Sequence, residues 1–587
     1  MGGVAAALAA CRGGHKVCLT EEMPWLGGQA TAQGVSALDE HDHIESFGAT
    51  ASYYSWRESI RAYYRDRWPL SEAAEAADFF NPGDGWVSRC CFEPRVGVIT
   101  LLELLREHVA SGRLQLHYGV VATEVEGGSG HVSRVRLQQA DEVGELLIEA
   151  AYVLDATELG DLLPLTGTAW RTGAESVEQT GEPHARTDGP APHLVQTWTI
   201  PFIVERDAPG TDHTIPRPAG YEANRDQQPF TLTMTYGTRD LTYKVFEPVD
   251  ELPGAFWTYR RVLAASQFAP GHVVGDLAMI NWAGNDYKGG DPGSGDLRSG
   301  DLISAAPERR RQLIEEAKQL SLGLLYWLQT EVPRDDGQGT GYPELRLRRE
   351  AMGTADGLAM FPYVRESRRI VARTTVREQD VSAAFQSGAR AEFFSDSVGV
   401  GWYPIDIHGV PGDVAVTGPT RPFQIPLGAL IPKDGPDNLL AACKNIGTTH
   451  MTNGCYRLHP IEWNIGEAAG ALAGYCVDEG VTPATVHSTP GHLAAYQRRL
   501  IDAGMPLTWF TDVPIGHPAF EAVQQLAAAG VVQGREGDLL FRPDEAVDDE
   551  LREQLSAIGV VAGAGEDVVG SSTRGEAVMA AARRISP

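Results

Sequence analysis

The sequence predicts an α/β fold divided into several domains, and three observations lead to that prediction. The chain has 587 residues, which is too long for one ordinary domain. Its 43% hydrophobic and 22% charged residues, with 65 glycines, are typical of a globular protein rather than of a disordered or fibrous chain. The third observation is local: a helix of small residues is followed directly by a short apolar strand that ends in two acids. This order of elements is typical of α/β units.

Charge and cysteine content exclude several classes of function. The 49 basic and 78 acidic residues give a net charge of −29, which repels phosphate backbones and anionic membranes, so we expect no nucleic-acid partner. No run of 18 apolar residues occurs, so no membrane span is expected. The seven cysteines form no C-x-x-C pair and fit neither a disulfide framework nor a zinc ribbon. A reducing, cytoplasmic location is the simple expectation.

The first 22 residues resemble the inside of a nucleotide-binding unit. Residues 2–12 predict a helix that stops at Gly13-Gly14, and residues 16–20 predict a strand that ends at Glu21-Glu22. In a dinucleotide-binding unit, the acid after the second strand accepts the ribose hydroxyls. Gly3 then occupies the third glycine position of G-x-G-x-x-G, and Glu21 follows 18 residues later. An Ala-rich core helix followed by a strand is the alternative interpretation.

The beginning of such a unit is missing from this sequence. The strand before the helix and the first two glycines of the fingerprint are absent. The missing turn would hold the pyrophosphate at the helix N-terminus. We therefore expect that extending the reading frame upstream reveals a strand ending in G-x-G.

Several further motifs point to one family when they are taken as a set. They are Glu21–Thr31 (with Pro24-Trp-Leu-Gly-Gly-Gln29), Tyr152–Asp161, Glu366–Ile370, Asp396-Ser-Val, Asp406–His408, Asn438–Gly447, His459-Pro460 and Gly466–Gly470. In this order they resemble the FAD-dependent oxidoreductase family of the glutathione-reductase-like flavoprotein superfamily, over roughly residues 2–480. The resemblance implies a Rossmann-like FAD-binding domain, FAD as the cofactor and an oxidoreductase activity.

The resemblance also implies which residues contact the cofactor. The predicted contacts are Gly2, Gly3, Glu21, Gly27, Gly28 and Gln29 for the nucleotide, Val121 for adenine, Ala156, Thr157 and Gly160 at the second turn, Asn445 and Gly447 near the ribityl and phosphate groups, and Asn464, Ile465 and Gly466 at the pyrimidine end. A helix that starts near Asn464 is expected to direct its backbone N–H groups at the flavin ring.

The order of predicted elements divides the chain into four parts. We predict an FAD-binding domain over residues 1–165, an inserted mixed α+β substrate domain over 166–420, the rest of the FAD-binding domain over 421–500, and a small helical segment over 505–587. Within them we expect helices at 53–67, 100–110 and 306–330, strands at 114–118, 120–125, 195–204 and 230–236, and a hairpin of 132–137 with 146–150. Residues 114–150 are expected to form the small β-meander of the superfamily.

The C-terminal segment has a second resemblance. The motifs at 509–514, 517–520, 530–534 and 541–544 are similar to an S-layer homology module, and such modules bind cell-wall polymer. One copy without the usual basic motif leaves an alternative, a helical appendage that caps the enzyme. Cell-wall association is therefore a second possible location.

For catalysis the candidates are His408, Arg365 and Arg368. Histidine can shuttle a proton near neutral pH, and an arginine can bind a substrate carboxylate or oxyanion. In Ile405–His408, residues 406 and 408 fall on one face of a strand, so Asp406 should contact His408. Each candidate has a structural alternative, a hydrogen-bonded histidine or a solvated helix turn. Residues 39–43 contain two histidines and acids, but we expect no metal site.

The sequence thus favours an FAD-dependent oxidoreductase that acts on a small polar organic substrate by hydride transfer to flavin. The electron acceptor is not identified, and no second dinucleotide fingerprint indicates NAD(P)H. The alternative is a non-catalytic, cell-wall-associated protein with a degenerate FAD fold.

Overall fold

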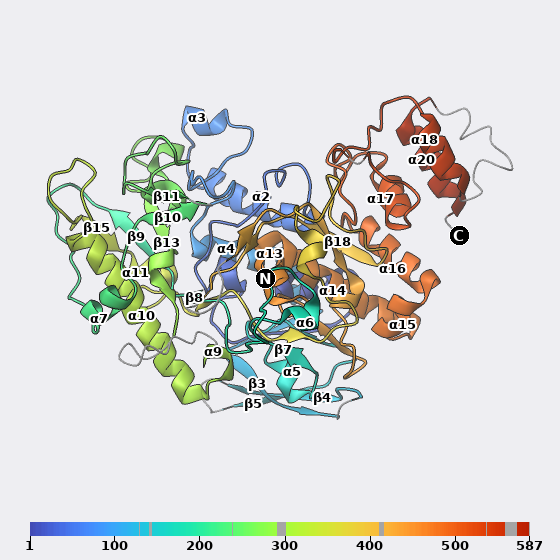
Figure 1. Cartoon of the computed structure of the whole chain (residues 1–587), viewed down its shortest axis with the longest axis horizontal. Helices are drawn as coiled ribbons and strands as arrows, with labels where there is room; N and C mark the ends of the chain where they lie inside the picture. Colours follow the sequence, from blue (N-terminus) through green and yellow to red (C-terminus); the bar gives the residue numbers. More distant parts are fainter. Residues whose placement is uncertain are drawn as a thin grey trace.

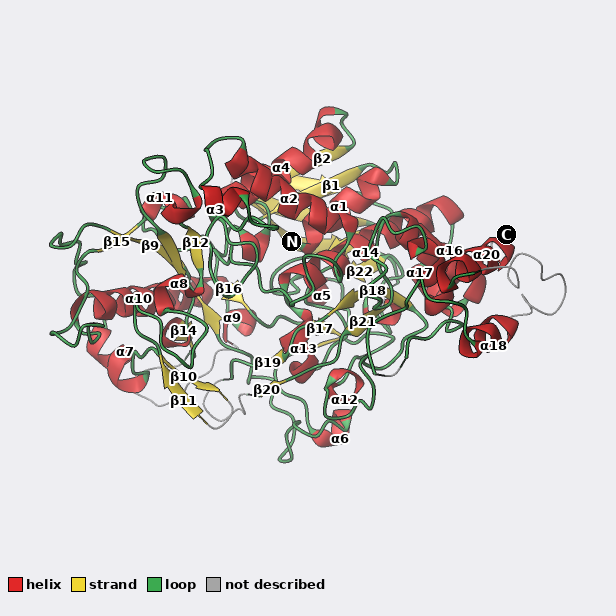
Figure 2. Ribbon diagram, turned by 90° about the horizontal axis from the view of Figure 1, so that it is seen from above, coloured by secondary structure: helices red, strands yellow, loops and turns green. Residues whose placement is uncertain are grey.

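The computed structural model describes residues 1–127, 130–139, 144–236, 239–289, 301–409, 416–535, 537–557 and 572–585. A central body contains the N-terminal helix, a lobe with the longest described helix lies on one side, and the C-terminal helices project on the other (Figure 1). In the view from above, helices and strands mix throughout the body, as expected for an α/β fold (Figure 2).

Two pairs of parallel strands frame the N-terminal helix α1 (Gly2–Arg12). Strand β1 (Val17–Glu21) pairs with β2 (Leu114–Tyr118), and β6 (Val153–Asp155) pairs with β22 (Leu439–Ala441). The predicted helix 2–12 is confirmed, and the strand predicted at 16–20 is found one residue later. At the start of α1, a Cβ added to Gly2 would overlap the carbonyl oxygen of Ala442, so α1 touches the second strand pair through backbone.

The meander is smaller than predicted. Its strands are β3 (Val120–Glu126), β4 (Arg134–Gln139) and β5 (Glu145–Ile148), which form one antiparallel sheet. The predicted hairpin is confirmed. Strand β2 is not part of the meander, because its ladder is the parallel one with β1. The helix predicted at 100–110 begins earlier and is α4 (Pro94–Ala110), with proline in its first turn.

Helix α14 (His459–Glu479) packs along α1 at very short range. A Cβ added at Gly466 would overlap the carbonyl oxygen of Gly2, and one at Gly470 would overlap that of Ala6. The helix expected to start near Asn464 therefore starts five residues earlier, after α13 (His450–Tyr456). Pro460 in its first turn marks the true beginning. The first-turn N–H groups belong to residues from His459 onward, not to Asn464–Gly466.

The inserted lobe has its own core and sheet. Strands β12 (Arg261–Leu263), β13 (Leu277–Ile280), β9 (Phe202–Arg206) and β15 (Leu345–Leu347) form an antiparallel sheet beside α10 (Pro307–Thr330). The single strand predicted at 195–204 is instead two, β8 (Trp198–Thr199) and β9, because Pro201 has no N–H for a ladder. Strand β8 pairs with β14 (Asp286–Tyr287) and β16 (Tyr363–Val364).

The remaining described helices and strands connect these parts. They are α2 (Ala51–Arg65), α3 (Glu72–Glu75), α5 (Leu162–Leu165), α6 (Val177–Thr180), α7 (Tyr221–Gln227), α8 (Phe256–Tyr259), α9 (Asp301–Ser304), α11 (Arg349–Met352), α12 (Glu378–Val381), β7 (Trp170–Arg171), β10 (Thr233–Tyr236), β11 (Arg239–Thr242), β17 (Arg369–Ile370), β18 (Ser397–Gly401), β19 (Ile405–Asp406), β20 (Thr417–Gly418) and β21 (Phe423–Pro426). None of the helices in the described ranges is both long enough and apolar enough to cross a membrane.

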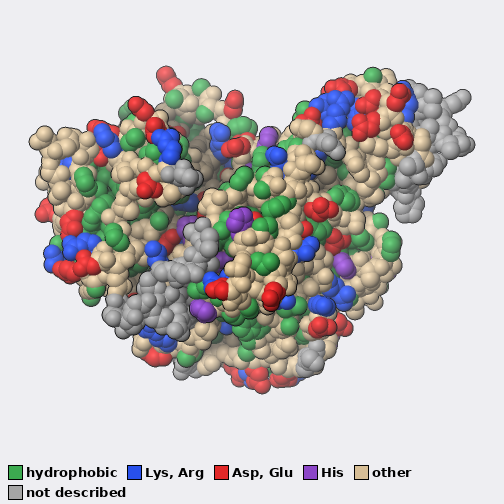
Figure 3. Space-filling view, in the orientation of Figure 1, with side chains coloured by type: hydrophobic (Ala, Val, Ile, Leu, Met, Phe, Trp, Pro, Cys, Tyr) green, Lys and Arg blue, Asp and Glu red, His purple; other side chains and the backbone are tan. Residues whose placement is uncertain are grey.

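The C-terminal helices continue the core of the central body. They are α15 (Pro483–Ser488), α16 (Pro490–Asp502), α17 (Phe520–Ala528), α18 (Asp549–Ala557) and α20 (Arg574–Ile585). One cluster of buried side chains runs from Ile465 and Leu472 through Leu500 to Val523 and Ala577. On the face seen in Figure 3, basic and acidic side chains are interspersed over this lobe. The domain boundaries near 165, 420 and 505 stay predictions.

Candidate functional site

A glycine turn after β1 forms the first half of the candidate cofactor cradle. Gly27 and Gly28 have φ angles of 112° and 52°, the left-handed region that favours glycine. A Cβ on Gly28 would lie 2.7 Å from Glu158 Oε1 and 3.7 Å from Gln33 Nε2. A side chain at position 28 would therefore collide with the carboxylate of Glu158, and the chain passes it as bare backbone.

Glu21 ends β1 beside this turn. Its Oε1 accepts the backbone N–H of Met23 at 2.9 Å. Burial raises the pKa of this carboxyl to about 7. A half-protonated acid at the end of the strand is chemically suited to exchange hydrogen bonds with hydroxyl groups such as those of a ribose.

The second predicted turn follows β6 and is built around Asp155. This buried carboxylate accepts hydrogen bonds from Thr157 N (3.0 Å), Thr157 Oγ1 (2.7 Å) and Leu162 N (3.2 Å). Burial raises its pKa to about 6. Asn445 Nδ2 donates to Asp155 O at 3.0 Å, so the predicted positions Ala156, Thr157 and Asn445 lie together at the ends of the strand pair β6–β22.

The other predicted cofactor positions all have protein atoms as close neighbours. Gly2 and Gly3 start α1, where Gly2 lies against Ala442 and Gly3 faces Ala156. The rest are Gly160 against Arg368, Gly447 against Ala372 and Thr374, Gly466 against Gly2, Asn464 against Gly399, Ile465 in the core, and Val121 in the β3–β4 ladder opposite Gln138. Their cofactor roles stay predictions.

Glu462 and Gln29 connect the cradle to the rest of the site. Glu462 Oε1 accepts Gly2 N at 3.3 Å, and Glu462 Oε2 accepts Gln29 Nε2 at 3.0 Å. Burial opposes ionisation of Glu462, but Lys444 at 3.8 Å and the Met1 ammonium at 3.2 Å outweigh it and lower its pKa. Gln29 Nε2 also donates to the carbonyl oxygen of Arg457 at 3.2 Å.

His408 lies between two carboxylates. Its Nδ1 is 2.7 Å from Asp286 Oδ2, and its Nε2 is 3.2 Å from Asp406 Oδ2, so the contact expected between residues 406 and 408 is present. Burial and Arg365 act to lower the pKa of His408, but the two carboxylates outweigh them and raise it. Both ring nitrogens therefore donate, and the charged imidazolium is the favoured form. The side chains of His408 and Asp406 each keep 28% exposure, so this pair faces solvent.

The two predicted arginines have different surroundings. Arg365 belongs to the same network, since its Nη2 is 2.9 Å from Asp286 Oδ1 and its Nη1 donates to Thr197 O and Thr199 Oγ1. It lies behind Asp286 and orients that carboxylate. Arg368 lies elsewhere, where it donates to Leu159 O and Ile303 O and pairs with Asp161. The structure therefore does not bring Arg368 to His408.

Sequence reasoning missed several members of this network. Arg457 Nη2 is 3.2 Å from Asp406 Oδ2, and its Nη1 donates to Tyr363 OH at 2.8 Å. Asp286 was also missed, because it belongs to none of the motifs or elements that the sequence predicts, although it lies in the two-residue strand β14. The signal for Arg457 was its position two residues before the His459-Pro460 motif.

Asp39 and His459 complete the wall of the network. Asp39 pairs with Arg260 at 2.8 Å, and Asp39 N donates to His459 Nδ1 at 3.0 Å. His459 Nε2 donates to Val35 O at 3.0 Å, which fixes the neutral tautomer. Burial lowers the pKa of His459 to about 4, in agreement with that tautomer. His41 stacks on the ring of Trp402 and meets the ring of Trp509 edge-on.

The cradle leaves buried polar atoms that the described protein does not satisfy. Gln29 Oε1 and both amide atoms of Gln33 are buried without a partner in the described part of the chain. Buried amides are almost always hydrogen-bonded. A ligand with both donors and acceptors on one edge, such as FAD, would satisfy them. The residues present therefore fit FAD.

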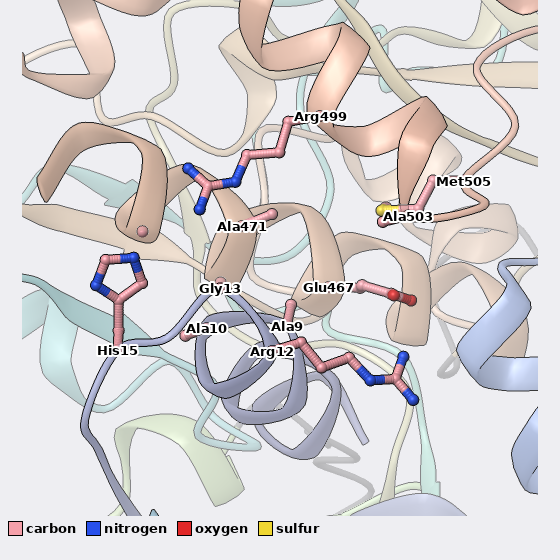
Figure 4. Close-up of a pocket in the computed structure, with 12 residues that line it drawn as sticks. Ala9, Ala10, Arg12, Gly13, His15, Glu467, Ala471, Arg499, Ala503 and Met505 are labelled. Atoms are coloured by element: carbon pink, nitrogen blue, oxygen red, sulfur yellow. The ribbon is translucent and has the colours of Figure 1, made fainter. Parts of the chain in front are cut away.

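A separate cavity of about 350 Å³ lies at the other end of the α1–α14 pair (Figure 4). Arg12, His15, Glu467 and Arg499 are its charged or titratable lining residues. Arg499 pairs with Asp478 at 2.8 Å, and Ser52 Oγ donates to Glu467 at 2.6 Å. Of the residues in the predicted motifs, Gly470 is the one that lines this cavity, and none of the predicted cofactor or catalytic residues does.

No curated protein matches this chain. Among solved structures, a chain of the "Mycobacterium smegmatis Sdh1 complex in the apo form" has 13% identity, covers 83% of this chain and 67% of that chain, and has a TM-score of 0.23, which is too low to support an argument. A family model for an S-layer homology domain matches residues 510–548. The model described as FAD dependent oxidoreductase matches residues 1–500, so the chain belongs to the FAD-dependent oxidoreductase family, with FAD as its cofactor.

Proposed function

We propose that this flavoenzyme oxidises a small polar organic substrate beside His408. One observation carries the proposal: the Gln29 amide contacts both Glu462 of the cradle and the backbone of Arg457, whose guanidinium binds Asp406 next to His408. A chain of two residues, Gln29 and Arg457, thus connects the cradle to the half-buried histidine–carboxylate pair. When bound, FAD supplies the redox chemistry by accepting a hydride from the substrate.

In this proposal the chain holds and moves the proton. The half-buried Asp406–His408 pair meets the substrate, and Asp286 with Arg365 behind it fixes the imidazole orientation. A neutral His408 takes the substrate proton and returns it to solvent as the imidazolium. Because its pKa is raised, the neutral form gains population only as the pH rises above the usual histidine range. The rate of substrate oxidation should therefore increase with pH through that raised pKa.

The test is the variant His408→Ala in full-length, FAD-loaded protein. Removal of a general acid–base group typically slows a reaction by about 10²–10⁴-fold, so we expect flavin reduction at least about a hundredfold slower with FAD still bound. Anaerobic stopped flow measures this with a substrate found by screening alcohols, amines and hydroxy acids. His213→Ala, which removes a histidine paired with Asp207 in the inserted lobe, is the control and should react like the wild type.

Two results would contradict this role for His408. Loss of FAD from His408→Ala would indicate a structural histidine. Reduction at the wild-type rate would remove it from the reaction. The non-catalytic alternative makes a different prediction, a purified protein without the yellow flavin absorption near about 450 nm.

We also propose that the enzyme works at the cell wall. The S-layer homology match supports this location over the cytoplasmic one that the cysteine content favours. Full-length protein should co-sediment with purified cell wall, and a substitution at Arg574, which holds Asp548 and Phe541 in this lobe, should weaken the sedimentation. Protein that stays in the supernatant at all wall concentrations would contradict the proposal.

A further inference from the structure

The side chain of Gln33 has a position that the predicted site does not explain. It follows the Gly27-Gly28 turn, and its backbone N–H donates to Gly28 O at 3.1 Å. The residue before Gln33 contacts the inserted lobe, because Ala32 O accepts the N–H groups of Met360 and Phe361. Gln33 is 1% exposed, so its side chain is held inside the molecule between the cradle and the inserted lobe.

Neither polar atom of this amide has a hydrogen-bond partner among the residues that the structure describes. Within the described residues, Gln33 is the one buried side-chain amide for which both the nitrogen and the oxygen are unpaired. The nearby Gln29 has only its oxygen unpaired, since its nitrogen donates to Glu462 and Arg457. A buried, unsatisfied donor or acceptor is strongly unfavourable and rare in native proteins. The N–H donor and the C=O acceptor of Gln33 are therefore available to a bound ligand.

The chemistry of that pair indicates its partner. A side-chain amide offers an N–H donor and a C=O acceptor side by side, which match an adjacent acceptor and N–H donor in a planar ring. FAD has two such edges, the imide edge of the flavin ring and the amino edge of adenine. Gln33 Nε2 lies 3.7 Å from the position that a Cβ on Gly28 would take. The neighbouring Gln29 donates to Arg457 O, and the Arg457 guanidinium binds Asp406 beside His408. The flavin end, where chemistry takes place, belongs on that side.

We infer that the side-chain amide of Gln33 binds the imide edge of the flavin ring and helps to set the reduction potential of FAD. This rests on FAD as the cofactor and not on any particular substrate. The amide donates to a ring oxygen and accepts from the ring N–H, so it acts as a positioning residue that touches the cofactor. Reduction places additional negative charge on the pyrimidine part of the ring, so the donated hydrogen bond strengthens in the reduced state.

The test compares Gln33→Met with a matched variant of a buried glutamine that protein atoms satisfy. Gln329 is the match: it is 2% exposed, its Oε1 accepts Ile215 N, and its Nε2 donates to His213 O and Leu345 O. Both substitutions replace an amide by an apolar chain of similar volume. In deflavinated full-length protein, Gln33→Met should fold as well as the wild type, whereas Gln329→Met should unfold at lower denaturant concentration.

The flavin measurements should show the opposite pattern. Gln33→Met should bind FAD roughly 5- to 150-fold more weakly, the range for losing two hydrogen bonds, and Gln329→Met should bind it normally. In FAD-loaded protein, Gln33→Met should shift the visible flavin bands and make the potential more negative. If the substitution weakens the binding of reduced FAD ten times more than that of oxidised FAD, the two-electron reduction potential falls by about 30 mV. Gln33→Glu, which replaces the donor by a second acceptor oxygen, should shift the potential further in the same direction.

Three outcomes would overturn the inference. Unchanged FAD affinity, bands and potential in Gln33→Met would mean an amide that water satisfies. Weaker binding with unchanged bands and potential would place Gln33 at the adenine edge instead. If Gln33→Met fails to fold, Gln33→Glu decides: wild-type bands and potential in that variant reject the contact.

Discussion

At the scale of single residues, a substitution at Glu21 would show whether the turn after β1 binds the ribose of the cofactor. Its carboxyl is held by Met23 N and has a pKa of about 7, so a ribose hydroxyl can donate to it and favour the ionised form. Glu21→Ala should weaken FAD binding by about 1.5–3 kcal/mol, the range for hydrogen bonds to charged groups. Fluorescence titration measures this. Exposed Glu22→Ala is the matched control, and a loss confined to Glu22→Ala would transfer the role to that residue.

His459 makes stability depend on pH in a predictable direction. The pKa of the folded protein is about 4, below the ordinary value of about 6.5, so between these values the unfolded chain binds more protons. The contribution of His459 is complete above about pH 6.5 and is lost as the pH falls toward 4, by up to about 3 kcal/mol.

Urea unfolding at about pH 7.0 and about pH 4.5 measures this loss, since these values lie about half a unit above the pKa of His459 in the unfolded and the folded protein. His459→Gln keeps a polar side chain that does not titrate, so its stability should fall less between the two pH values. Equal losses in wild type and His459→Gln would show that other groups carry the pH dependence.

The contact between Asp406 and His408 could be predicted from the sequence, because side chains two residues apart in an extended segment lie on one side, although strand β19 itself ends at Asp406. Asp286 could not, since it is 122 residues from His408 along the chain and reaches it through the pairing of β14 with β8. The same limit applies to Arg365: the residue was found, but its role behind Asp286 depends on tertiary structure.

At the scale of elements, the approach of α1 to α14 depends on glycine. A Cβ at position 466 would overlap the carbonyl oxygen of Gly2 and would push α1 away from the cradle. Gly466→Ala should therefore destabilise the fold by about 1–3 kcal/mol, as overpacking of a tight contact does. Gly491→Ala is the control, because α16 has open space at that position. Equal unfolding midpoints for the two variants would contradict the tight contact.

Local patterns predicted most elements whose apolar period was clear, such as 2–12 and 306–330. They failed where one residue changed the outcome. Pro201 divided a predicted strand, and Pro460 began a helix earlier than the glycine-rich motif at 466–470 indicated. Strand β2 was found in the right place but assigned to the wrong sheet, since the partner of a strand is not encoded in its own period.

At the scale of the whole molecule, the C-terminal lobe is joined to the body by polar contacts as well as by the common core. Arg390 Nε and Nη2 donate to Trp509 O at 3.0 and 2.7 Å, and its Nη1 donates to Asp538 O at 2.9 Å. Burial lowers the pKa of this guanidinium to about 10. Trp509 Nε1 in turn donates to Phe423 O at 3.1 Å in β21. The motifs of residues 509–544 could not predict this attachment, because they describe the module alone.

A detachable cap and a continuous core make opposite predictions for deletion of residues 505–587. A detachable cap would leave flavin content and unfolding unchanged. Because Phe510, Val523 and Leu526 share one buried cluster with Ile465 and Leu472 of α14, deletion exposes apolar surface next to the cofactor side of the molecule. We therefore expect the truncated protein to unfold at lower temperature and to retain less FAD, as measured by thermal unfolding and by flavin absorbance per chain.

Deletion of residues 505–587 removes 83 residues at once, so a point variant is needed to test the contact between the lobe and the body alone. Arg390→Ala leaves the carbonyl groups of Trp509 and Asp538 without their buried donor, which should cost about 1–3 kcal/mol. Arg535→Ala removes a half-exposed arginine of the same lobe that pairs loosely with Glu545 at 3.6 Å and should change little. If Arg390→Ala and the truncated protein both unfold like the wild type and keep full flavin, the lobe is a detachable module. If both lose stability and Arg535→Ala does not, the lobe is part of the folded oxidoreductase.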